Sequence, residues 1–152
     1  MGRFRSGAAC ILLGIAFVGP ALACSGGSQD RVHFASGSSA LDAESRRWLR
    51  SVASVMKEHR ELAFRLEGHS DRHGAERANW QLSLRRAESV RKFLFQDGVD
   101  QSRLTTAAFG SSRPVATCRK QACDVMNRRV VFVLTRGTLA SSSCPDDPDR
   151  DY

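Results

Sequence analysis

A polar loop at residues 68–74 is followed by a segment whose apolar spacing predicts a helix over about residues 75–96. Leu82 and Val90 recur at helical spacing, and Arg86 falls midway between them on the same apolar stripe. A guanidinium in that position keeps its charge, so it needs a partner or a polar site. Asp71 in the loop is the natural partner. Such a couple can hold a zwitterion, because the carboxylate binds an amine and the guanidinium binds a carboxylate at two points.

The other apolar patterns predict a small α/β fold. The strict alternation of residues 62–67 is typical of a half-buried strand, and Asp42 is a plausible N-cap for an earlier helix. Gly98 can end the helix over residues 75–96, because glycine readily adopts the left-handed conformation of a helix C-terminus. The expected elements are, in chain order, strand 32–34, a helix after Asp42, strand 62–67, helix 75–96, strand 104–109 and strand 130–134. This β-α-β-α-β-β order predicts one α/β sandwich in which two helices pack on one face of a mixed sheet.

The N-terminus has the pattern of an exported protein. Arg3 and Arg5 precede a short apolar run, and small residues then form a cleavage site, so residues 1–23 are expected to be a signal peptide. The apolar run is too short for a membrane-spanning helix. Residues 24–30 are then a short tether and residues 31–136 a folded domain. Residues 137–152, rich in Ser, Pro and Asp, are expected to be a disordered acidic tail.

Four cysteines remain after the signal peptide, and their roles differ. Cys24, at the first mature position, resembles the lipidated cysteine of bacterial lipoproteins, although the cleavage site also suits simple release. Cys118 and Cys123 are close in sequence and are expected to form a disulfide in an oxidising compartment. Cys144 is left over if Cys24 is acylated, and the two can pair if it is not. The chain is therefore expected either on the periplasmic face of the outer membrane, held by lipid, or free in the periplasm.

The charge of the chain is strongly positive, with a formal net charge of +7. In a cytoplasmic protein this balance would indicate nucleic acid as a partner. Export argues against nucleic acid and favours anionic lipid or a carboxylate-rich polymer. An Arg-rich solvated surface accounts for most of these charges without any partner.

Catalysis and metal binding have little support in the sequence. His69, Ser70 and Asp71 are direct neighbours, so their side chains diverge and cannot form a proton relay. The chain has no HExxH or G-x-S-x-G motif and no Gly-rich phosphate loop. We therefore expect no metal, no cofactor and no enzyme activity.

Five motifs in order and spacing resemble the OmpA-like peptidoglycan-binding domains found at OmpA C-termini, in Pal lipoproteins and in flagellar-motor MotB proteins. Residues 32–136 carry the resemblance. Its blocks are Val32-x-Phe34 with Ser39-x-Leu41-Asp42, Gly68-His69-Ser70-Asp71-x-x-Gly74, Asn79 with Leu82-Ser83-x-x-Arg86-Ala87-x-x-Val90, Phe109-Gly110 with Pro114, and Asn127-Arg128-Arg129-Val130. The chain departs from the pattern at Ala78-Asn79, where the family prefers Tyr-Asn. Trp80 follows directly after these two residues.

The resemblance implies a binding function. In that family the loop Asp and the helix Arg hold the diaminopimelate of the peptidoglycan stem peptide, which here gives Asp71 the amine and Arg86 the carboxylate. The residues that would line the same cleft are Phe34, His69, Ser70, Asn79 and Arg128. Peptidoglycan is then the expected partner, with possible roles for a membrane anchor and for envelope proteins. The alternatives are an envelope scaffold in which the Asp–Arg pair is structural, and a cell-wall hydrolase.

Overall fold

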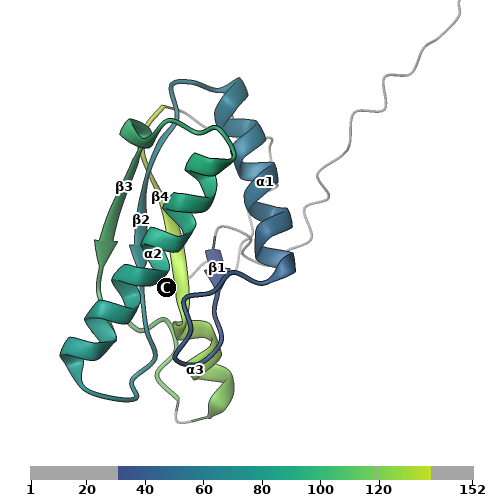
Figure 1. Cartoon of the computed structure of the whole chain (residues 1–152). Coiled ribbons are helices and arrows are strands. Elements are labelled where there is room, and N and C mark those ends of the chain that lie inside the picture. Colours follow the sequence, from purple (N-terminus) through teal and green to yellow (C-terminus); the bar gives the residue numbers. More distant parts are fainter. Residues whose placement is uncertain (1–30, 119, 138–152) are drawn as a thin grey trace, which may run out of the picture.

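Figure 1 shows a computed structural model of the chain, which describes residues 31–118 and 120–137. The expected signal peptide, tether and Cys24 lie outside these residues, as does the acidic tail apart from Gly137. The strands are β1 (Arg31–His33), β2 (Ala63–Gly68), β3 (Leu104–Ala108) and β4 (Arg129–Arg136). The helices are α1 (Ala43–Glu58), α2 (Glu76–Gln96) and α3 (Gln121–Asn127), with a short 3-10 turn at Gln101–Arg103.

The four strands form one mixed sheet in the order β1-β4-β2-β3. β4 is antiparallel to both of its neighbours, whereas β2 and β3 are parallel. α1 and α2 cover one face of this sheet (Figure 1). The predicted fold class and the packing of two helices on one face are therefore confirmed.

The core lies between these helices and the sheet. α1 contributes Leu49 and Met56, and α2 contributes Val90 and Leu94, all fully buried against strand residues such as Leu66. Burial of this apolar surface is the main driving force for the fold. Among the described residues, none of the helices has the length and apolar character needed to cross a membrane.

Both predicted helix ends have the expected chemistry. The Asp42 carboxylate accepts a hydrogen bond from the Ser45 N–H at 2.7 Å, which caps α1 and lowers the pKa of Asp42. At the end of α2, Gly98 has a φ of 92°, a left-handed conformation that glycine adopts without strain. Gly68, at the end of β2, lets α2 approach closely, because a Cβ there would collide with the carbonyl of Ser83.

The third helix, α3, was not predicted, because the expected elements include no helix between the strands at residues 104–109 and 130–134. α3 is short, and its N-cap residue Lys120 makes no side-chain capping bond. The expected disulfide between Cys118 and Cys123 is present and joins the helix to the segment before it. The Asn127 side chain also holds that segment, through the backbone of Val115 and Ala116. Tertiary contacts thus stabilise a helix that periodicity alone does not reveal.

Candidate functional site

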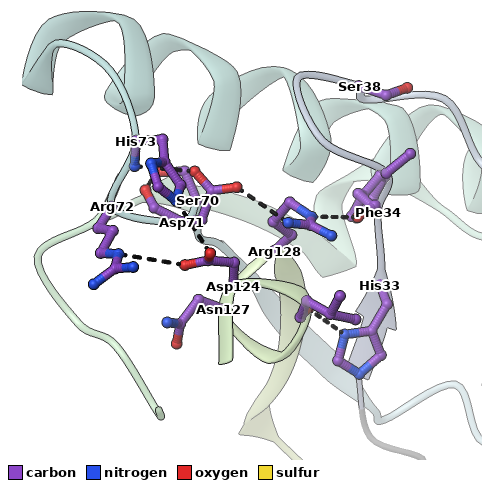
Figure 2. Close-up of polar contacts among 12 residues, drawn as sticks. His33, Phe34, Ser38, Ser70, Asp71, Arg72, His73, Asp124, Asn127 and Arg128 are labelled. Carbon is purple, nitrogen blue, oxygen red and sulfur yellow. Dashed lines mark hydrogen bonds and ion pairs between the residues drawn. The ribbon is translucent and has the colours of Figure 1, made fainter. Parts of the chain in front are cut away.

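The loop between β2 and α2 places Asp71 at the end of the sheet where α3 also lies (Figures 1 and 2). The loop is tied down by backbone bonds on both sides, since the His69 N–H donates to the carbonyl of Arg129 and the Ser70 N–H to that of Gly110. Asp71 is only 7% exposed, so the charge of its carboxylate requires compensation from nearby groups.

Arg128, which lies between α3 and β4, provides that compensation. Its Nη1 lies 3.3 Å from Oδ2 of Asp71, and its Nε donates to the carbonyl of Phe34 at 3.0 Å (Figure 2). The Asp71 carboxylate also accepts from the backbone N–H of His73 at 3.2 Å. The carboxylate is therefore held by one guanidinium and one backbone amide, which fixes its direction.

Arg86 does not form the expected ion pair with Asp71. Its guanidinium is completely buried and donates to three backbone carbonyls, those of Ser38, His69 and Ala35, at 2.8, 2.9 and 3.1 Å. The same guanidinium lies over the ring of Phe34, 5.3 Å from its centroid. Arg86 thus joins α2 to the turn of residues 35–38 and to the loop that carries Asp71. Carbonyl oxygens accept the hydrogen bonds of its guanidinium, where a carboxylate was expected.

Asp71 nevertheless influences Arg86 through space. Burial lowers the pKa of Arg86 to about 10, while the charge of Asp71 opposes that decrease and Arg128 adds to it. Arg86 therefore stays protonated at neutral pH. The carboxylate of Asp71 and the guanidiniums of Arg86 and Arg128 form one charged group, which we call the Asp71 cluster. Its excess of positive charge favours an anionic group on any ligand.

Residues of α3 fix the loop from a second side. Asp124 accepts from His73 at 3.1 Å and pairs with Arg72 at 3.6 Å (Figure 2). Asp124 itself is 7% exposed. None of these three residues was singled out as part of a site from the sequence. The signal for them is weak, because Asp124 belongs to the unpredicted helix and meets the loop only in the folded chain.

The remaining expected site residues gather around the same end of the sheet, but they are buried instead of lining an open cleft. Ser70 donates from its hydroxyl to the carbonyl of Asp71, and His69 stacks on Phe109 at 5.5 Å between ring centroids. Asn79, on α2, is 5% exposed, and its Nδ2 finds no hydrogen-bond partner among the described residues. A buried donor without a partner costs free energy unless a ligand or water satisfies it.

The buried imidazole of His69 predicts a specific pH dependence. Burial, together with the charges of Arg129 and Arg113, lowers the pKa of His69 to about 4. Between pH 6.5 and 4 the unfolded chain then binds a proton at this position that the folded chain does not. Each pH unit in that range should cost about 1.4 kcal/mol of unfolding free energy, so stability falls as the pH falls.

The measurement is urea unfolding at several pH values for the natural chain and for His69→Phe, which keeps a ring against Phe109 without a titrating group. The natural chain should lose on the order of 2–3 kcal/mol more than the variant between pH 6.5 and 4. Parallel pH profiles for the two proteins would show that His69 has an ordinary pKa.

Comparison with known proteins places these observations in a family. A model described as "OmpA family" matches residues 33–128. A protein named peptidoglycan-associated lipoprotein from Mesorhizobium japonicum is 38% identical over 106 residues, which are 70% of this chain and 63% of that protein. The chain spans between 59% and 63% of the length of the first curated relatives it matches.

Solved structures show the same architecture. The crystal structure of the peptidoglycan-associated lipoprotein from Burkholderia pseudomallei aligns with a TM-score of 0.68 at 27% identity, covering 70% of this chain and 90% of that one. The C-terminal domain of Helicobacter pylori MotB aligns with a TM-score of 0.66 at 23% identity, covering 73% and 86%. The second likeness concerns the fold alone.

Proposed function

This chain belongs to the OmpA family, and we propose that its folded domain binds peptidoglycan without covalent attachment and without cleaving it. The observation that carries this proposal is the Asp71 cluster, a buried carboxylate paired with the Arg128 guanidinium on a loop that Arg86 and Asp124 hold in place. The name of the relatives, peptidoglycan-associated lipoprotein, supports the same ligand. The domain would then anchor or organise the cell envelope from the periplasmic side of the outer membrane.

The finer proposal is that diaminopimelate in the stem peptide is the group recognised. Its side chain ends in an amine and a carboxylate on one carbon, a zwitterion that matches a carboxylate beside guanidiniums. Asp71 would accept from the amine. Arg128, which is 9% exposed and uses only part of its five N–H donors, can bind the carboxylate directly.

The proposed role of Arg86 has to account for the backbone carbonyls to which its guanidinium already donates. Two of its three acceptors are carbonyls of the turn at Ala35 and Ser38. A ligand carboxylate that replaced these carbonyls would give the guanidinium an equivalent and charged acceptor. Arg86 therefore holds the site together in the free domain. We propose that it contacts the carboxylate of the ligand when the turn of residues 35–38 moves away from it. Phe34, His69, Ser70 and Asn79 would complete the surroundings.

Sedimentation with purified sacculi of the diaminopimelate type tests the proposed function. The domain, residues 31–136, should pellet with the sacculi, and no soluble fragments should appear. Retention in the supernatant at low salt would favour the scaffold alternative, in which the cluster is structural. Release of soluble muropeptides would favour a hydrolase.

Membrane attachment is a separate proposal that rests on Cys24. Acylation of this residue would place the domain close to the outer membrane, because the tether of residues 24–30 is short. Mass spectrometry of the mature N-terminus distinguishes an acylated Cys24 from a free or disulfide-bonded one.

A further inference from the structure

A second surface next to the Asp71 cluster has the features of a binding site. A pocket of about 580 Å³ lies between the first turns of α2 and the segment that follows β3. Its volume is within the range of about 300–1,000 Å³ that is common for small-molecule sites. Its lining includes Gly74, Glu76, Arg77, Trp80, Phe109 and Ser112.

Trp80 is the unusual residue in this pocket. It is 50% exposed, whereas the other tryptophan, Trp48, packs edge-on against Phe132 beside the core. An indole has a large apolar surface and one N–H donor, and leaving half of it in water forgoes much of its burial energy. The other aromatic ring of the pocket, Phe109, already stacks on His69, and the Arg113 guanidinium lies 3.9 Å from the Phe109 ring centroid. Of the two aromatic rings that line the pocket, Trp80 is therefore the one that a ligand can stack on.

The walls of the pocket are held in place before any ligand binds. A Cβ at Gly110 would lie 3.1 Å from the backbone nitrogen of Trp80, so the segment after β3 packs directly on α2. The Ser83 hydroxyl accepts from the Gly110 N–H at 3.0 Å and donates to the carbonyl of Trp80 at 2.7 Å. A preformed pocket binds without the cost of ordering its own residues.

The pocket and the Asp71 cluster share one loop. Gly74, which ends the loop that carries Asp71, lines the pocket, and Gly110 on the opposite wall accepts from the Ser70 N–H at 2.8 Å. A ligand that occupies both places must have two linked parts. One part carries the amine and carboxylate. The indole of Trp80 suits a second part with an apolar face, and the polar side chain of Ser112 in the pocket lining suits polar substituents on it. The adjacent opposite charges of Glu76 and Arg77 at the rim suit such an uncharged polar group.

We propose that the Trp80 pocket binds an N-acetylated amino sugar of the glycan strand, with the apolar face of the pyranose ring stacked on the indole. This inference rests on the proposed function, because the sugar is covalently linked to the stem peptide that would occupy the Asp71 cluster. Glu76 and Arg77 would hydrogen-bond to the hydroxyl and acetamido groups, one as acceptor and the other as donor.

Calorimetric titration with two defined probes tests the proposal. One probe is the stem tripeptide that contains diaminopimelate, and the other is the same tripeptide attached to its disaccharide. Trp80→Ala should weaken binding of the disaccharide-tripeptide about tenfold, the change that corresponds to ~1.4 kcal/mol, while its affinity for the free tripeptide stays that of the natural domain. Phe95→Ala is the matched control, since Phe95 is also 50% exposed on α2 but lies in its last turn.

The outcomes separate this inference from the function on which it rests. Equal affinities of Trp80→Ala and the natural domain for the disaccharide-tripeptide would overturn the sugar site alone. The same conclusion would follow if Trp80→Ala weakened both probes equally, because Trp80 would then act on the peptide site. Failure of the natural domain to bind either probe would overturn the proposed function and the sugar site together.

Discussion

Changing Asp71 to Asn is expected to lower the affinity of the domain for diaminopimelate-type peptidoglycan at least tenfold. The amide keeps the shape of the side chain and an acceptor for the His73 N–H, but it removes the charge that attracts an amine. It also leaves the guanidinium of Arg128, a buried residue, without its ionic partner. Losing one member of a desolvated, hydrogen-bonded charge pair costs about 2–5 kcal/mol of binding.

Sacculus sedimentation at a series of protein concentrations measures this loss. Asp97→Asn is the matched control, because Asp97 lies at the opposite end of α2 and pairs with Lys57 in a partly exposed contact. The control should bind like the natural domain, and circular dichroism should show that both variants fold. If Asp71→Asn binds sacculi as tightly as the control does, the Asp71 cluster is structural.

Arg86→Ala is expected to have the largest effect on stability, lowering the free energy of unfolding by about 3–5 kcal/mol. The side chain is fully buried, and its removal leaves the carbonyls of Ala35, Ser38 and His69 without their donors. It also opens a cavity beside Phe34. The turn of residues 35–38 and the Asp71 loop would lose their common attachment to α2.

Arg85→Ala is the control for this prediction, since Arg85 is the adjacent residue of the same helix and is exposed. Urea unfolding should place Arg85→Ala within about 0.5 kcal/mol of the natural domain. A loss below about 1 kcal/mol for Arg86→Ala would contradict the view that Arg86 is the main link between the loops.

The elements that were predicted correctly are those with a local signal. The alternation of residues 62–67 corresponds to β2, and the cap at Asp42 and the glycine at Gly98 define helix ends in the structure as in the sequence. The third helix has no such signal, because it is short and depends on the disulfide and on Asn127.

In the candidate site, too, the residues with a local signal were predicted and their long-range partners were not. Asp71 and Arg86 were identified from a motif and from the position of Arg86 on an apolar stripe. Their partners were not. The partner of Asp71 lies 57 residues away in sequence, at Arg128, and the acceptors of Arg86 are backbone carbonyls, which leave no trace in residue types. Long-range pairing and backbone acceptors are decided by the folded geometry, so only the structure reveals them.

The central claim, recognition of diaminopimelate by the Asp71 cluster, is tested most directly by comparing two stem tripeptides that differ in one group. One ends in diaminopimelate and the other in lysine, which keeps the amine and lacks the adjacent carboxylate. Because a charge-assisted bond to a buried guanidinium is worth about 1.5–3 kcal/mol, calorimetry should show at least tenfold tighter binding of the diaminopimelate peptide. Equal affinity for the two peptides would contradict the account.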